Sequence, residues 1–134
     1  MREKAKEILE TKKVFAVIGV TQDEAKYGYE VFHTLKEFGY KTYPLNPKYE
    51  EIAGNKCYTS LKDLPESPEV IVLALAPQNT EKILDRITRR DAKIVWMPPG
   101  CWSERAVEKC RQNSIDLIYD VCPVGTLLAI KGGD

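Results

Sequence analysis

Apolar and polar positions along the chain follow two different periods. Short apolar runs occupy residues 14–19, 70–75, 94–97 and 117–119, and with the more polar residues 41–45 they indicate five strands. The runs at 14–19 and 70–75 are apolar on both faces, which is typical of central parallel strands. Segments with apolar residues every three or four positions occupy residues 2–10, 28–38, 80–90 and 103–110, and they indicate amphipathic helices. Strand and helix therefore alternate, with connections long enough for crossovers.

This order predicts an α/β fold: a Rossmann-like three-layer sandwich with a parallel five-stranded sheet and helices on both faces. Parallel strands need right-handed crossovers, and the helical segments supply them. Local signals support the boundaries, because Gly39 is placed to end one helix and Thr80 and Ser103 are placed to cap two others. Residues 61–65 indicate a single helical turn closed by proline.

Length and composition fit one globular domain. The chain has 134 residues, 43% of them hydrophobic and 30% charged, so we expect a single domain over residues 1–134. Twenty basic and twenty acidic residues give no net charge, which disfavours general binding to nucleic acid or a membrane surface. No apolar run is long enough to span a bilayer, and the charged start lacks a signal-peptide core. We expect a cytoplasmic protein.

The four cysteines do not suggest a metal site. Cys57, Cys101, Cys110 and Cys122 form no CxxC pair, and His33 is the only histidine. Zinc sites need clustered ligands, so no metal is expected, and in a reducing cytosol we expect free thiols.

Parallel sheets bind ligands at the carboxyl ends of their strands, so four loops hold the candidate site. The first loop, residues 19–28, has only Gly19 and Gly28 where a dinucleotide fingerprint needs three closely spaced glycines. This spacing disfavours an ordinary NAD site. The loop still leads into a helix N-terminus that favours phosphate, where Thr21 can offer a hydroxyl and Lys26 a charge. The alternative is a plain surface loop.

The second loop, residues 46–48, carries Lys48 where NAD-binding proteins place an acid for the ribose hydroxyls. A cation there suits a phosphorylated ribose, as in NADP or coenzyme A. A solvated lysine in a turn is the alternative interpretation.

The last two loops are rich in proline. Pro77 either stiffens a pocket wall or simply ends a strand, and residues 97–100 form a rigid turn. Cys101 precedes a helix whose dipole could lower its pKa, or it is inert; Trp102 either stacks on a ligand or covers apolar surface. A lone mid-helix histidine builds no nucleophile–base pair, so the sequence favours a binding module over an enzyme.

Taken together, these motifs resemble the stand-alone CoA-binding domain proteins, which are related to the N-terminal domain of the succinyl-CoA synthetase α subunit. The resemblance spans about residues 5–128. The matching segments are residues 17–21, 26–29, 39–40, 43–48, 52–58, 60–65, 96–100 and 120–122.

The resemblance implies a Rossmann-like fold that binds coenzyme A, and it implies a role for each loop. The diphosphate and pantetheine path would be lined by Gly19, Val20 and Thr21, with Lys26, Tyr27 and Gly28 completing the loop. The adenosine end would be held by Asn46, Pro47 and Lys48, beside a wall made by Ala76 and Pro77. The pantetheine arm would face Met97, Pro99 and Gly100.

Two positions depart from the family pattern. Val20 stands where the family often has alanine, and Val121 replaces an arginine in the usual Asp-Arg-Cys, although Cys122 remains, near the implied thiol end. The histidine-bearing second domain of the ligase relatives is not implied here. We therefore expect a protein that binds coenzyme A or acyl-CoA without catalytic machinery of its own.

Two alternatives stay open. The first is an NADP-linked enzyme subunit. The second is a thiol redox sensor in which Cys101 or Cys122 forms a mixed disulfide with coenzyme A. The sequence also leaves open a homodimer or an unidentified protein partner.

Overall fold

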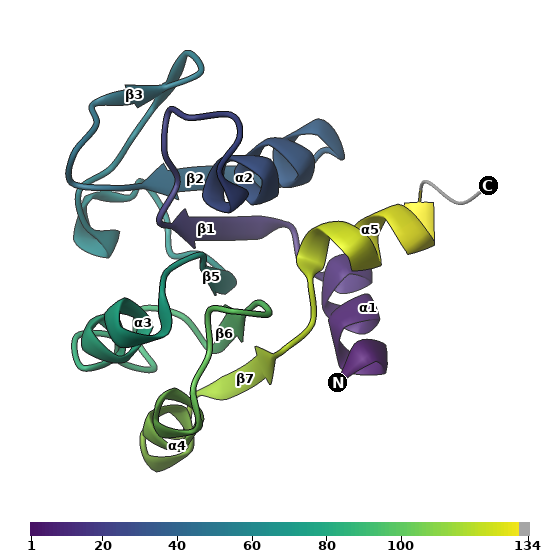
Figure 1. Ribbon diagram of the computed structural model, residues 1–134, viewed down its shortest axis with the longest axis vertical. Coiled ribbons are helices and arrows are strands. Elements are labelled where there is room, and N and C mark those ends of the chain that lie inside the picture. The colour runs from purple at the N-terminus through teal and green to yellow at the C-terminus, as the bar shows by residue number, and fades with distance from the viewer. Residues whose placement is uncertain (132–134) are drawn as a thin grey trace.

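The computed structural model describes residues 1–131, and its centre is a five-stranded sheet (Figure 1). All neighbouring strands are parallel, in the order β2-β1-β5-β6-β7. The strands are β1 (Val14–Ile18), β2 (Lys41–Leu45), β5 (Val70–Leu73), β6 (Ile94–Met97) and β7 (Asp116–Tyr119). The predicted parallel, Rossmann-like sheet is confirmed.

Helices cover both faces of the sheet. One layer contains α1 (Arg2–Thr11), α2 (Tyr27–Glu37) and α5 (Pro123–Lys131), and the other contains α3 (Pro77–Leu84) and α4 (Glu104–Gln112). Each layer packs on its own apolar cluster, and α1 also packs against α5. The sandwich is therefore three layers thick, as the strand–helix alternation predicts.

Alternate residues along each strand supply the two cores. In β1, Phe15 and Val17 pack with the layer of α1, α2 and α5, whereas Ala16 packs with the layer of α3 and α4. In β6, Trp96 packs with the layer of α1, α2 and α5, and Met97 packs with the layer of α3 and α4; both side chains are fully buried. Because successive side chains point to opposite faces, a strand covered on both sides must be apolar throughout.

The helix boundaries match the expected caps at two places and differ at a third. The Ser103 hydroxyl accepts the Ala106 N–H at 3.0 Å, and Gly39 takes a left-handed φ of 93° just beyond α2. The prediction that Thr80 caps a helix is wrong, because α3 begins at Pro77 and places Thr80 inside its second turn. Proline suits the first helical position, where no N–H is needed. The Thr80 hydroxyl is buried and has no hydrogen-bond partner within residues 1–131.

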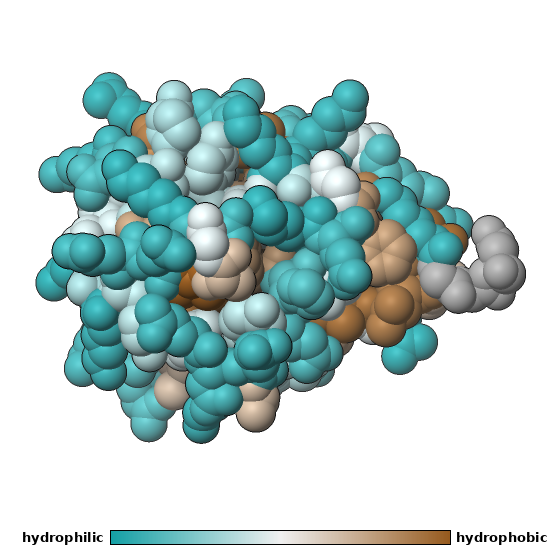
Figure 2. Space-filling view, turned by 90° about the horizontal axis from the view of Figure 1, so that it is seen from above, coloured by the Kyte–Doolittle hydropathy of each residue, from teal (hydrophilic) through white to brown (hydrophobic). Residues whose placement is uncertain are grey.

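Two elements were not predicted. The first is a short hairpin of β3 (Glu51–Ile52) and β4 (Asn55–Lys56), which lies beside β2. The single turn η1 (Leu61–Asp63), which follows this hairpin, was predicted. Helix α5 was also missed, since its residues are apolar almost all round and show no stripe. Figure 2 shows an apolar patch at one end of the molecule. On α5, Leu128 is 49% exposed. No helix in the described range has both the length and the apolar character needed to cross a membrane.

Candidate functional site

The strand order of the sheet reverses between β1 and β5, so the carboxyl ends of these two strands form its switch point. β1 runs into α2 on one face of the sheet, whereas the neighbouring β5 runs into α3 on the other face. The two connections therefore diverge at this switch point, the β1–β5 crevice, which is where open α/β sheets bind ligands.

Two glycines let the backbone crowd together at this crevice. Gly19 ends β1 with a φ of 101°, and a Cβ there would lie 2.3 Å from the Ala74 carbonyl oxygen. A Cβ on Gly28, at the start of α2, would lie 2.2 Å from the Gly19 carbonyl oxygen. Only glycine fits at either position. The first turn of α2 thus presses against the end of β1, which leaves the loop backbone free of side-chain bulk there.

Asn46 joins the loop after β2 to the loop after β1. Its side-chain amide donates to the Val20 carbonyl at 3.0 Å, and its side-chain oxygen accepts the Lys48 N–H at 3.0 Å. Both ends of the amide are therefore used inside the protein. Asn46 positions Lys48 rather than offering its own side chain to a ligand. Val20 is fully buried, so only its backbone can face the crevice.

The loop between β1 and α2 is held by its own polar groups. The Thr21 hydroxyl accepts the Asp23 N–H at 3.2 Å, and the Gln22 side-chain amide donates to the Glu51 carbonyl at 2.9 Å. Thr21 is thus partly committed within the loop. Gln22, which sequence reasoning did not single out, ties the loop to the β3–β4 hairpin. A loop fixed at both ends can present its backbone N–H groups in a stable arrangement.

Two predicted cations remain available on either side of this loop. Lys26 is exposed at the N-cap of α2, and Lys48 is exposed beyond β2, next to the exposed Pro47. Within residues 1–131, neither lysine lies in an ion pair. Both are therefore free to meet an anion, and the helix dipole at the start of α2 adds to the charge of Lys26.

The predicted residues after β5 and β6 divide into exposed and buried ones. Ala76 is exposed at the N-cap of α3 and Pro77 is half-buried, while Pro99 and Gly100 are exposed on the turn after β6. Met97 is fully buried in the core shared with α3 and α4. Its side chain lies on the inward side of β6, so the prediction that Met97 faces a ligand concerns its backbone alone.

Tyr27 makes a contact that brings distant parts of the chain together. Its hydroxyl lies 3.1 Å from the Cys122 sulfur, at the junction of β7 and α5. Burial, followed by the hydrogen bond with Cys122, raises the pKa of Tyr27 well above its usual range. Tyr27 therefore stays neutral and connects the start of α2 to the β7–α5 junction.

Three further residues with a proposed chemical role in the sequence, Cys101, Trp102 and His33, make structural contacts instead. Cys101 is buried, and burial raises its pKa, which favours the alternative that this cysteine is inert. Trp102 packs against Tyr119 with ring centroids 5.0 Å apart, which fits the interpretation that it covers apolar surface. His33 is exposed on α2, where it pairs with Glu37 and stacks on Tyr29, so it is not placed as a base for this site.

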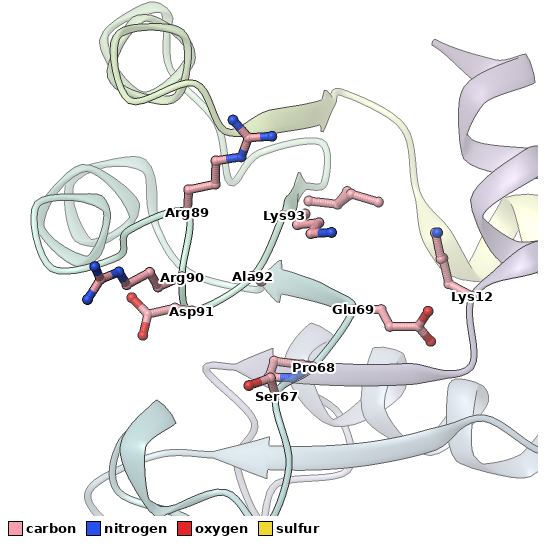
Figure 3. A pocket seen from close by; sticks show the side chains of 10 residues that line it. Lys12, Ser67, Pro68, Glu69, Arg89, Arg90, Asp91, Ala92 and Lys93 are labelled. Carbon is pink, nitrogen blue, oxygen red and sulfur yellow. The ribbon is translucent and has the colours of Figure 1, made fainter.

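Two hollows lie outside this crevice. One, of about 280 Å³, is at the amino ends of the strands, where Figure 3 shows Lys12, Glu69 and the segment 89–93. It contains none of the predicted site residues. The other, of about 790 Å³, lies between α1, α5 and the ends of β6 and β7, and Pro99 and Cys122 are among its lining residues. Over the described chain, no three potential metal ligands cluster.

Sequence reasoning overlooked the residues that join the loops to one another. Gln22 is an example: its side-chain amide donates to the carbonyl of Glu51, 29 residues away, and no local pattern reveals that contact. Polar residues such as Gln22 occur in most loops, so nothing in the sequence marks these ones.

Comparison with known proteins shows which family the chain resembles. The model of a family described as "CoA binding domain" matches residues 13–127, which include every loop at the carboxyl edge of the sheet. A hypothetical protein of known structure from Pyrococcus horikoshii superposes with a TM-score of 0.88 at 30% identity, over 96% of this chain and 91% of that one.

Curated relatives include both short and long proteins. YneT of Bacillus subtilis is 25% identical over 117 residues, covering 87% of each chain. An ADP-forming acetate–CoA ligase of Methanocaldococcus jannaschii is 37% identical over 81 residues, which are 60% of this chain, and the match covers 12% of that enzyme. The α subunit of an ADP-forming acetate–CoA ligase II from Pyrococcus furiosus is 34% identical over 99 residues, which cover 73% of this chain and 22% of the subunit. The family match extends over most of the present sequence, and the chain therefore belongs to the CoA-binding domain family.

Proposed function

We propose that the protein binds coenzyme A or an acyl-CoA at the carboxyl edge of its sheet and carries out no chemistry on it by itself. The observation that carries this proposal is the family match over residues 13–127, which spans the whole edge. The local geometry supports it, because a bare glycine backbone and a helix N-terminus favour phosphate at the end of β1.

Each part of the ligand has a proposed place. The diphosphate lies against the backbone of residues 19–21 and the start of α2, with Lys26 and Gly28. The 3′-phosphate of the adenosine lies near Lys48, which Asn46 and Pro47 position. The pantetheine arm passes Ala76 and Pro77 and continues past Pro99 and Gly100 towards Tyr27. Of the other predicted residues, Val20 and Met97 act through their backbone and their packing.

The absence of a catalytic role is part of the proposal. His33 pairs with Glu37 on an exposed helix face, so it does not supply a base at the crevice. The long relatives are named as ligases, but this chain matches 12% of one and 22% of another, so their activity is not carried over.

The charge of Lys48 provides the first test. We expect Lys48→Ala to weaken coenzyme A binding by about 1.5–3 kcal/mol, or roughly 10- to 150-fold, because a charge-assisted contact to the 3′-phosphate is lost. Titration calorimetry measures this directly. Lys93→Ala, at the amino edge of the sheet, is the matched control and should leave the affinity unchanged.

Ligand variants separate the two phosphate positions. With dephospho-coenzyme A, Lys48→Ala should have no further effect, whereas Lys26→Ala should weaken both ligands alike because it faces the diphosphate. Equal losses for both ligands in Lys48→Ala would remove Lys48 from the 3′-phosphate. Tighter binding of NADPH than of coenzyme A by the same sample would favour the NADP-linked alternative and contradict the proposal.

A further inference from the structure

Helix α5 is apolar on every side, although only part of it is covered. Two of its nine residues, Thr126 and Lys131, carry polar side chains. The helix packs against α1 and α2, yet Leu128 is 49% exposed, Ala129 is exposed and Ile130 is half-buried. Figure 2 shows apolar surface at the end of the molecule where Figure 1 places α5. A helix that is apolar all round is normally covered all round, so the outer face of α5 lacks a cover within the part of the chain that the structure describes.

The hollow of about 790 Å³ lies beside this face, between α5 and α1. Its wall on α5 includes Ala129 and Ile130, and its wall on α1 is formed by Arg2, Lys6 and Glu10. The spacing of four places the α1 residues on one stripe of that helix. Leu128 adjoins Ala129 in sequence. The same patch therefore offers an exposed apolar side chain and a space that could receive one.

The charged side chains around the hollow are balanced in sign. Arg2 and Lys6 are basic, and Glu10 and Asp120 are acidic. All four are exposed, and within residues 1–131 none of them lies in an ion pair. A partner with a strong single charge, such as a nucleic acid, would meet as much repulsion as attraction here. A surface with a balanced set of charges is the better electrostatic match.

A second copy of the chain carries such a surface. A two-fold interface joins the same patch on both copies, so the patch must be complementary to itself. Arg2 and Glu10 lie eight residues apart on one stripe of α1, or about 12 Å. When two α1 helices run antiparallel across a two-fold axis, Arg2 of each copy can meet Glu10 of the partner subunit. The opposite charges at the two ends of the stripe are therefore complementary to themselves.

We propose that the outer face of α1 and α5 is the interface of a homodimer, in which Leu128 of each copy enters the hollow of the other and Arg2 pairs with Glu10 across the axis. Of the two kinds of protein partner that the sequence left open, the balanced charges favour a second copy. The face is two short helices wide, so we expect a dissociation constant in the micromolar range. The interface contains none of the proposed phosphate contacts, so dimer formation does not depend on coenzyme A.

Sedimentation equilibrium over about 1–200 µM protein measures the association directly. We expect the mean mass to rise from near 15.2 kDa, that of one chain, towards twice that value. Leu128→Glu places a charge in the apolar contact twice per dimer, so it should weaken association at least about tenfold. Gln112→Glu is the matched control, because it adds the same charge at the exposed end of α4 in the opposite layer, and it should leave the association unchanged.

Either of two outcomes would overturn the inference. A wild type that stays monomeric at the highest concentration would assign the patch to a different protein. Association that persists undiminished in Leu128→Glu would show that another surface joins the copies. Because Leu128 is exposed, its replacement should leave the fold intact. Circular dichroism and thermal unfolding at a concentration where the wild type is monomeric check this directly.

The pairing of the two α1 helices has its own test. Arg2→Glu and Glu10→Arg each bring like charges together across the axis, so each should weaken association severalfold at low salt. The double variant with both changes restores opposite charges and should recover the association of the wild type. Both changes also suit the helix dipole, so α1 should still form. A double variant as weak as the single ones would overturn the antiparallel pairing.

Discussion

At the scale of single residues, the site depends on two glycines, because their lack of a side chain lets two backbone segments approach closely. Gly28 lies in the first turn of α2, where alanine would ordinarily be the better helix former. Its hydrogen nonetheless occupies a place in which a Cβ would be 2.2 Å from the Gly19 carbonyl oxygen. Contact between two backbones, rather than helix propensity, therefore determines this position, and it keeps the start of α2 against the end of β1.

Replacing Gly28 measures that contact. We expect Gly28→Ala to lower the free energy of unfolding by about 1–3 kcal/mol, as overpacking against rigid backbone does, and to weaken coenzyme A binding by displacing α2. Gly125→Ala is the control, since its Cβ would have no neighbour closer than 3.8 Å, and it should raise stability by about 0.5–1 kcal/mol. Urea denaturation measures both. A stabilising Gly28→Ala would show that the helix can move away at no cost.

At the scale of elements, helix starts organise the carboxyl edge. α2, α3, α4 and α5 all begin there, each directly after a strand or its loop. Ser103 shows how such a start is fixed, because its hydroxyl accepts the Ala106 N–H at 3.0 Å and lies 2.8 Å from a Glu81 carboxylate oxygen. One side chain thus caps α4 and links it to α3.

Removing the Ser103 hydroxyl should lower stability mainly through the lost cap of α4, and less through the lost contact between α3 and α4. We expect Ser103→Ala to lower the free energy of unfolding by about 1–2 kcal/mol, because the Ala106 N–H loses its acceptor. Glu81→Gln keeps the cap and alters only the link between α3 and α4, so thermal unfolding of both variants separates the two effects. An equal loss in each would mean that the link, not the cap, stabilises α4.

At the scale of the whole molecule, the proposed ligand connects the two helical layers. It would touch α2 from one layer and the start of α3 from the other, on both sides of the β1–β5 crevice. A ligand that binds only the folded state stabilises the entire sandwich, and the gain depends on its concentration relative to Kd.

Coenzyme A should therefore raise Tm. At a concentration of 100 times Kd the gain is about 2.7 kcal/mol, which for a domain of this size corresponds to a Tm increase of about 8–10 °C. Differential scanning fluorimetry with reduced protein measures the increase. Adenosine alone should give a much smaller shift, and no shift with saturating coenzyme A would contradict the proposed function.

Much of the fold could be predicted from local pattern. Strands β1, β5 and β6 are apolar on both faces, which requires cover on both sides and hence parallel strands with crossover helices. Helix α5 escaped the same reasoning because its apolar residues surround it, so no periodic stripe marks it. The start of α3 was misplaced because threonine caps helices often, whereas the proline three residues earlier fits the first turn better.

The sequence by itself determined the alternation of strands and helices, the glycines at the end of β1 and the start of α2, and a lysine after β2. Each is a local property of residue type and spacing. Only the tertiary structure decided that Asn46 is used to hold the Lys48 turn, that Met97 faces inward, and that Tyr27 meets Cys122. These outcomes depend on which strands become neighbours and which way each side chain turns, and contacts across 95 residues leave no trace in local spacing.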